Sequence, residues 1–153
     1  MVRTAAGHGQ CARRGCLAQA VPQRGIDVVV VGQLPGDMVI GERNGNLNYY
    51  RNTGTAANPS WTLATENLGA VSTIEWINVT GHSTPHFITN EQGQRELLLG
   101  SESGAIYHYG DIDGNLDGNW TRLDTAWRGM DDGARTVLCL HDFTGDGQQD
   151  LVV

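Results

Sequence analysis

Three evenly spaced aspartates near the end of the chain are the arrangement best suited to chemistry. The last thirteen residues read HDFTGDGQQDLVV, where Asp142, Asp146 and Asp150 surround two glycines and lead into apolar residues. Calcium prefers roughly six to eight oxygen ligands, and a tight loop can present alternate residues inward to supply them. The alternate positions of this stretch, which we predict to bind Ca²⁺, are Asp142, Thr144, Asp146, Gln148 and Asp150.

Each position of this loop has an expected role. The three carboxylates supply most of the negative charge, Thr144 supplies a hydroxyl or a water contact, and Gln148 supplies its backbone carbonyl. Gly145 and Gly147 allow sharp backbone turns without a Cβ penalty. An EF-hand is excluded, because its bidentate glutamate would fall at the twelfth loop position, which is Val153. A solvated hairpin turn that binds no metal is the alternative interpretation.

A second acidic stretch, DIDGNLDGN, also alternates oxygen-bearing side chains at Asp111, Asp113, Asn115 and Asp117. Leu116, however, stands where a turn glycine is expected, and position 122 is an arginine. The pattern favours an exposed turn that its own Asx side chains stabilise. A second ion bound by Asp111, Asp113 and Asp117 stays open as the alternative.

No motif in the chain predicts catalysis. The stretch GSESG resembles a nucleophile elbow, but its middle residue is Glu102 and not serine. The histidines His82, His86 and His141 have no companion at a metal-binding spacing, which favours structural roles for them. We therefore expect a protein that is not an enzyme.

The elements that position these residues come from an internal repeat. Residues 37–70 and 96–129 align without a gap at an offset of 59, and a third copy begins at Asp150 with DLVV. The matched pairs are Asp37 with Glu96, Gly41 with Gly100, Gly45 with Gly104, Leu47 with Ile106, Tyr50 with Tyr109, Trp61 with Trp120 and Thr62 with Thr121.

Each unit predicts four short antiparallel strands. The runs MVIGE and ELLLGS suit a sheet buried on both faces, and GNLNYY and GAIYHY suit a hairpin partner exposed on one side. SWTLATE and NWTRLDT predict a third strand, and STPHFIT and TVLCLHDF predict the remaining one. Four-stranded units that repeat every 55–59 residues or so are typical of β-propeller blades. We expect an all-β chain, a partial β-propeller, without helices of any length.

This pattern resembles the FG-GAP/VCBS repeat family. The resemblance rests on DxxGDGxxD before an apolar strand, on GxLxYY, and on an RNTGT…NP loop followed by WTL, and it covers about residues 36–153. It implies an extracellular or cell-surface propeller with calcium in its hairpin loops, used for adhesion, ligand binding or scaffolding. The five loop positions match the family's calcium loop, with Thr144 where Asp or Asn is more usual.

The aligned copies of this loop predict one calcium site and not one per blade. Aligned on Glu96, the second loop reads ITNEQGQRE, with Ile88 and Gln92 in place of Asp142 and Asp146. Aligned on Asp37, the first loop reads VVVGQLPGD and offers no other ligand.

The sequence divides into a head and three units. We expect an unstructured or non-native head at 1–25, a first blade with a degenerate start at 26–70, a second blade at 71–130, and the truncated start of a third at 131–153. Because a propeller needs about four to eight blades, this division predicts a fragment whose partners include the remaining blades. Aromatic residues could bind glycans at Tyr50, Trp61, Tyr109 and Trp120, although packing between blades is the favoured role for most of them.

Charge and cysteine content restrict the partners. All ten basic residues are arginine, and four of them precede residue 25, so the remaining chain carries 17 acids against 6 arginines. Such an acidic body argues against nucleic acid, and no apolar run is long enough to span a membrane. Cys11, Cys16 and Cys139 predict no disulfide framework, and a zinc site with His8 lacks a fourth ligand.

Three functions remain open at this point. The first is a calcium-supported scaffold for adhesion to glycans or surface proteins. The second is an accessory propeller domain of an extracellular polysaccharide-degrading enzyme, and the third is a structural spacer without a ligand of its own.

Overall fold

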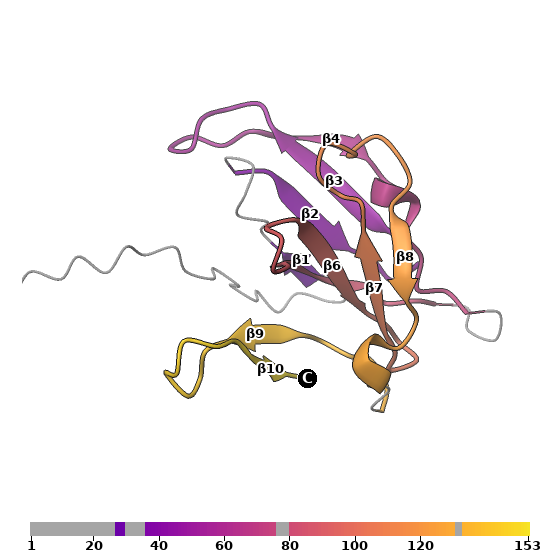
Figure 1. Cartoon of the computed structure of the whole chain (residues 1–153). Helices are drawn as coiled ribbons and strands as arrows, with labels where there is room; N and C mark the ends of the chain where they lie inside the picture. Colours follow the sequence, from indigo (N-terminus) through magenta and orange to yellow (C-terminus); the bar gives the residue numbers. More distant parts are fainter. Residues whose placement is uncertain (1–26, 30–35, 76–79, 131–132) are drawn as a thin grey trace, which may run out of the picture.

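The computed structural model of the 153-residue chain describes residues 27–29, 36–75, 80–130 and 133–153. The expectations for the head, including those for His8, Cys11 and Cys16, lie outside the described residues. Figure 1 labels the elements, which are β1 (Asp27–Val29), β2 (Met38–Gly41), β3 (Leu47–Asn52), β4 (Trp61–Thr65), η1 (Leu68–Ala70), β5 (Thr84–Thr89), β6 (Arg95–Gly100), β7 (Ile106–Gly110), β8 (Thr121–Asp124), η2 (Trp127–Gly129), β9 (Cys139–His141) and β10 (Asp150–Val152).

The strands form two complete four-stranded sheets and one hairpin. The strand orders are β1-β2-β3-β4 and β5-β6-β7-β8, and every neighbouring pair is antiparallel. Strands β9 and β10 pair in the same manner. The described helical turns are the two short 3-10 segments η1 and η2. The prediction of an all-β chain with four antiparallel strands per unit is therefore confirmed.

The 59-residue repeat is visible in the details of both sheets. The segments η1 and η2 start and end at positions that differ by this offset. The register between the third and fourth strands shifts between Tyr49 and Tyr50 in the first sheet, and between His108 and Tyr109 in the second. An irregularity of this kind bends a strand and raises its twist. Matching sequence has thus produced matching backbone irregularities.

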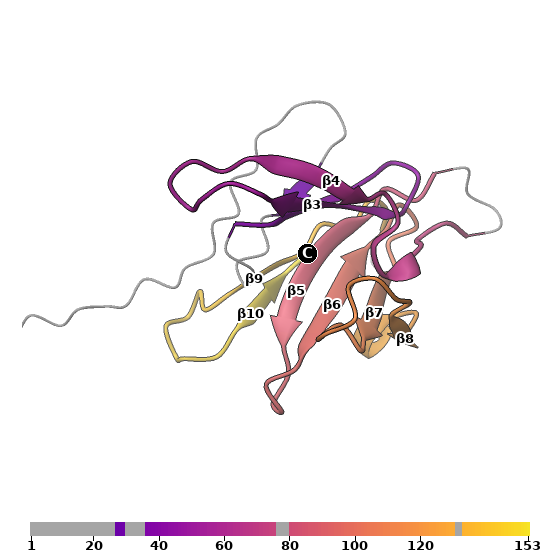
Figure 2. The ribbon, with the colours of Figure 1, turned by 90° about the horizontal axis from the view of Figure 1, so that it is seen from above.

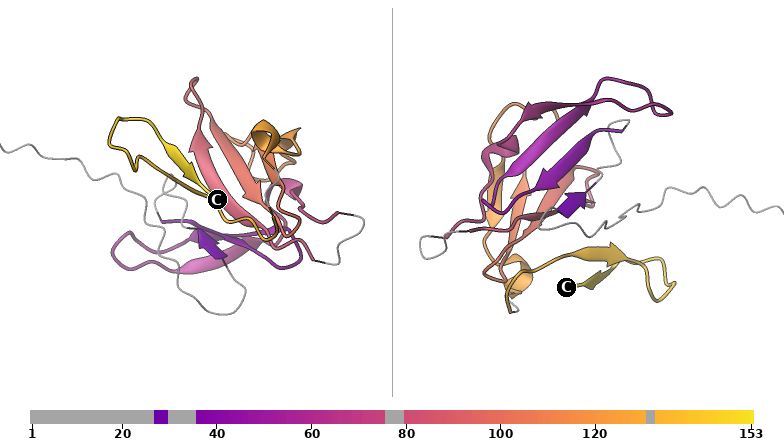
Figure 3. Two further views of the ribbon diagram at one scale, coloured as in Figure 1. Left: turned by 90° about the horizontal axis from the view of Figure 1, so that it is seen from below. Right: turned by 180° about the vertical axis from the view of Figure 1, so that it is seen from behind.

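The two sheets and the hairpin stack face to face. Figures 2 and 3 show sheet β1–β4, sheet β5–β8 and hairpin β9–β10 in chain order, with the second sheet in the middle. A large apolar cluster joins the first two sheets and contains Val39, Leu47, Tyr49, Leu68, Val71, Leu97, Leu99, Ala105, Tyr107, Tyr109, Ile112 and Trp120. A smaller cluster joins the second sheet to the hairpin and contains Leu98, Ile106, Leu138 and Leu140.

The middle sheet is buried on both of its faces. Leu97, Leu98 and Leu99 are fully buried, as the apolar run ELLLGS predicts. The expectation that GAIYHY would be exposed on one side is wrong, because Tyr107 and Ile106 lie in different apolar clusters. Alternate residues of a strand point to opposite faces of the sheet. A strand that lies between two packed layers therefore needs apolar residues at both its odd and its even positions.

Two linkers, the segment between η1 and β5 and the segment between η2 and β9, connect successive units, and hydrogen bonds from each linker hold one unit to the next. Ser83 Oγ donates to the carbonyl of Asn46 at 2.6 Å, and Thr136 Oγ1 donates to the carbonyl of Gly104 at 2.7 Å. A Cβ on Gly41 would lie 1.9 Å from the Ser83 carbonyl oxygen, so the matched glycine at this position allows the linker to approach. Among the described residues, no helix is long and apolar enough to cross a membrane.

Candidate metal-binding loop and its counterparts

The predicted calcium loop is the turn of the β9–β10 hairpin. Asp142, at its start, directs its carboxylate at the backbone of the loop. Its Oδ1 accepts hydrogen bonds from the N–H groups of Gly145 at 2.6 Å and Asp146 at 3.1 Å, and its Oδ2 accepts one from Gly147 at 2.9 Å. These bonds lower the pKa of Asp142, and the N–H of Gly147 makes the largest contribution. The carboxylate is therefore held in its ionised form.

The other predicted ligands also engage the loop backbone. Asp150 Oδ2 accepts the N–H groups of Phe143 at 2.9 Å and Thr144 at 3.1 Å. Asp146 Oδ1 accepts the N–H of Gln148 at 2.8 Å. The loop is thus closed from both ends by carboxylates that bind main-chain donors.

The two glycines of the loop have the backbone conformation expected of them. Their φ angles are +76° at Gly145 and +86° at Gly147, in the left-handed region that L side chains rarely adopt. The tight turn therefore depends on glycine at both positions, which confirms the local prediction.

The donor set suits calcium in its chemistry, because it consists of three carboxylates, a hydroxyl and a backbone carbonyl. In the part of the chain that the structure describes, however, no group of three or more His, Cys, Asp and Glu side chains is placed to hold a metal ion. The three aspartates point at separate sets of N–H groups. Calcium binding at this loop stays a prediction.

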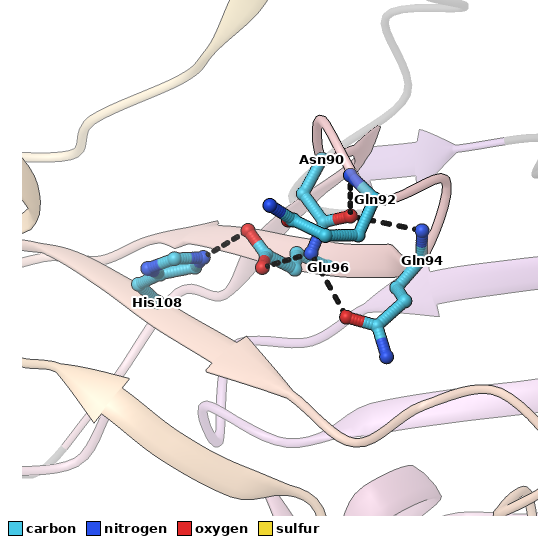
Figure 4. Close-up of polar contacts among 5 residues, drawn as sticks. All are labelled: Asn90, Gln92, Gln94, Glu96 and His108. Carbon is cyan, nitrogen blue, oxygen red and sulfur yellow. Dashed lines mark hydrogen bonds and ion pairs between the residues drawn. The ribbon is translucent and has the colours of Figure 1, made fainter.

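The corresponding loop of the second unit is closed by hydrogen bonds between its side chains. Figure 4 shows the carboxylate of Glu96 between His108 and Asn90. His108 Nε2 lies 2.7 Å from Glu96 Oε2, and Asn90 Nδ2 donates to Glu96 Oε1 at 2.8 Å. The side-chain oxygen of Asn90 accepts the N–H groups of Gln92 at 3.1 Å and Gln94 at 2.9 Å. One asparagine therefore fastens the turn to the acidic residue at its end.

The first unit uses a third solution at the same position. Asp37 is buried and matches Glu96 in the repeat. Its Oδ2 accepts the hydroxyl of Tyr49 at 2.6 Å, and its Oδ1 accepts the N–H of Asn52 at 2.7 Å. Burial, followed by the hydrogen bond to Asp37, raises the pKa of Tyr49, so this hydroxyl keeps its proton and donates it.

Sequence reasoning aligned the three acids but missed their partners. Tyr49 and His108 are separated by 59 residues, as are Asp37 and Glu96, the acids that they bind. This shared offset is the sequence signal that could have identified the partners. The gapless alignment of the loops is also wrong. His141 pairs with Asp150 as Ile88 pairs with Glu96, so the third loop contains one residue more than the second. The first aspartate therefore follows strand β9 and does not replace Ile88.

The second acidic stretch forms a turn held by its own side chains. Asn115 Nδ2 donates to the carbonyls of Asp111 at 3.0 Å and Asn119 at 3.1 Å. The pKa of Asp113 is lowered, most strongly by the hydrogen bond from the backbone N–H of Arg95 and next by the Arg95 side chain. Nε of Arg95 lies 2.5 Å from Asp113 Oδ1. The geometry agrees with an Asx-rich turn, in which Asp113 already has a cationic partner.

The predicted aromatic ligand platform does not exist as one surface. Tyr109 and Trp120 are buried between the first two sheets, where Trp120 meets Phe87 edge to face. Tyr50 is half-buried, and Trp61 is 48% exposed on the outer side of the first sheet. The structure therefore leaves Tyr50 and Trp61 as the accessible half of the set.

Glu102, in the nucleophile-like stretch, lies in the β6–β7 turn and links two successive linkers. The hydroxyl of Thr80 donates to its carboxylate, and this bond lowers the pKa of Glu102 more than His82 or Arg135 does. His82 lies 3.7 Å away and Arg135 lies 3.6 Å away. In the described residues, no serine or cysteine side chain hydrogen-bonds an imidazole.

Comparison with known proteins adds no relative to this description. The chain matches no family model, no curated protein and no solved structure. Its resemblance to the FG-GAP/VCBS repeats therefore depends on the linked motifs of its own sequence and stays a prediction.

Proposed function

We propose that the chain is a segment of a β-propeller of the FG-GAP/VCBS kind, which serves as a non-enzymatic scaffold for adhesion or ligand binding at a cell surface or outside the cell. The observation that supports this most is the stacking of successive units. Leu97 and Tyr109 on one face of the middle sheet and Leu98 and Ile106 on the other pack against different neighbours. Units that pack this way at both faces are the building principle of propellers.

The proposal includes one calcium ion in the β9–β10 loop. Its ligands would be Asp142, Thr144, Asp146, Gln148 and Asp150, and the ion would offset the mutual repulsion of the three carboxylates. To bind the ion, the carboxylates of Asp142, Asp146 and Asp150 would turn from their separate N–H donors toward one point. The counterpart loops bind their acids through Tyr49 and through His108, and we assign no ion to them.

Calorimetric titration of the full chain with CaCl₂ tests the metal assignment. Asp146→Ala should abolish the heat of binding, because it removes a predicted ligand from an exposed part of the loop. Asp117→Ala, an equally exposed aspartate of the Asx-rich turn, is the matched control and should leave the heat unchanged. Equal heats for the unsubstituted chain and Asp146→Ala would remove calcium from this loop.

The ligand-binding part of the proposal concerns the exposed aromatic residues. Tyr50 and Trp61 lie on the outer side of the first sheet, where sugars or a protein partner could stack. A glycan array tests this role with Trp61→Ala and with Leu123→Ala, an exposed apolar control on β8. A signal that both variants lose equally would speak against a role for Trp61.

A further inference from the structure

The exposed apolar residues of the molecule gather at the two ends of the sheet stack. Among the described residues, eight large apolar side chains are exposed, and five of them belong to the end layers. Two of these, Trp61 and Leu63, lie on β4 of the first sheet. The others, Phe143, Val152 and Val153, belong to the β9–β10 hairpin. Exposed apolar patches of this kind commonly mark interaction surfaces.

The outer side of the first sheet repeats a surface that is buried elsewhere in the chain. We call it the front face, and it contains Met38, Ile40, Tyr50 and Trp61. At the repeat offset these residues match Leu97, Leu99, Tyr109 and Trp120, all of which are buried against the preceding sheet. The same positions in the first sheet are half-buried or exposed.

Inside the chain, the front-face positions of one unit pack against the facing side of the preceding unit. The outer side of the β9–β10 hairpin is equivalent to that facing side. We call it the tail face, and it contains Cys139, His141 and Val152, which are all exposed. By cross-strand register, Val152 occupies the place of Leu98, and His141 occupies that of Ile88. Both residues of the second sheet belong to the cluster that packs against the following layer.

We propose that the tail face of one copy of this chain stacks on the front face of a second copy. The two faces are the two halves of the contact that the chain makes internally between successive layers, so the second copy continues the same stack. A contact between different faces is heterologous, and repeated use of it builds rings or open chains. The proposal depends on the stacking geometry and needs neither calcium nor a carbohydrate.

Trp61 is already oriented for such a contact. Its indole Nε1 donates to the carbonyl of Gly36 at 2.7 Å, which anchors the ring across the edge of the sheet. Its counterpart Trp120 is anchored in a similar manner, because Nε1 donates to the carbonyl of Asn115 at 2.8 Å while the ring packs on Gly69. An aromatic side chain held in advance loses little conformational freedom on binding.

Sedimentation velocity of the full chain over a wide concentration range tests the proposal. The chain should associate as its concentration rises. Trp61→Arg and Val152→Arg should each weaken this association by more than about tenfold, as the loss of a central apolar contact does in other interfaces. Leu123→Arg, an exposed residue on β8 outside both faces, should leave it unchanged. Tyr50→Arg, with circular dichroism for each variant, serves as a second front-face substitution in case Trp61→Arg unfolds.

Mixing the two variants separates this contact from others. A Trp61→Arg copy keeps its tail face and a Val152→Arg copy keeps its front face, so their mixture should form heterodimers and stop at two copies. A monomer at every concentration would overturn the proposal. So would association that only front-face variants abolish, because that front face would then bind itself. If the chain is monomeric and Trp61→Arg loses a glycan-array signal that the unsubstituted chain gives, the front face is a ligand-binding surface and the stacking is refuted.

Discussion

The hydroxyl of Tyr49 donates a hydrogen bond to the buried carboxylate of Asp37, and its removal should lower the free energy of unfolding by the contribution of that bond. Tyr49→Phe deletes the donor to Asp37 and leaves the ring that packs between the sheets. Asp37 is 8% exposed and Tyr49 is 4% exposed, so water has little access to replace the lost donor. The carboxylate keeps the N–H of Asn52 as its other partner.

The expected cost follows from the type of bond that is lost. A hydrogen bond to a charged group contributes about 1.5–3 kcal/mol, and the low exposure of both partners places Tyr49→Phe near the middle of that range. We expect the free energy of unfolding to fall by about 2 kcal/mol. For a chain of this size, the melting temperature should fall by roughly 4–8 °C.

Urea unfolding followed by circular dichroism measures this free energy, and Tyr50→Phe is the matched control. Tyr50 is the next residue and points to the opposite face, so its substitution should cost less than about 0.5 kcal/mol. A double-mutant cycle with Asp37→Asn then isolates the pair, and it should return a coupling of about 1–2 kcal/mol. If Tyr49→Phe and Tyr50→Phe cost the same, Asp37 does not depend on the hydroxyl and the reasoning is refuted.

Three further predictions concern packing and protonation. Gly69→Ala should cost about 3 kcal/mol in urea unfolding, because φ is +65° and the new Cβ would lie 2.3 Å from Trp120, whereas Gly93→Ala at φ +78° meets no atom within 4 Å and should cost about 1 kcal/mol. Burial raises the pKa of Tyr107 from 10.0 to about 12, so in this window the unfolded chain loses its proton first. The contribution of Tyr107 to stability should therefore be present below pH 10 and be lost between about pH 10 and about pH 12. The slope should stay below the one-proton limit of roughly 1.4 kcal/mol per pH unit, because solvent screens part of the effect, and Tyr107→Phe should flatten it. Asn48→Leu should destabilise the chain by about 1 kcal/mol in urea unfolding, because it removes the hydrogen bond that Asn48 Nδ2 donates to the Glu42 carboxylate, and this loss outweighs the relief of the buried amide oxygen, which has no partner among the described residues; an unchanged or higher free energy of unfolding would contradict this.

The repeat made the fold predictable from the sequence. Two stretches that share their glycines, aromatic residues and loop lengths at one offset must share a backbone, and the matched bulges at Tyr49 and His108 show that they do. The burial of GAIYHY on both faces was not predictable from one unit. It depends on what packs against each face, and Ile106 has a partner only because Leu138 and Leu140 follow in the next layer.

The candidate site was predictable only in part, for a different reason. The turn at Gly145 and Gly147 depends on backbone conformation, which the residue type restricts directly. The partners of Glu96 come from two different segments, and His108 reaches it across the sheet. Strand alternation alone does not say which residue of a neighbouring strand stands opposite until the register is known.

The three acids at one repeat position find hydrogen-bond donors in three different ways. A carboxylate at the end of a turn must find hydrogen-bond donors or a cation. Asp37 finds the hydroxyl of Tyr49, and Glu96 finds the side chains of His108 and Asn90. Asp150 accepts main-chain N–H groups of its own loop, and no cationic side chain among the described residues pairs with it or with Asp142 and Asp146. Among the described residues, the β9–β10 loop is therefore the one whose acid has only main-chain donors, and it is the loop for which we propose a calcium ion.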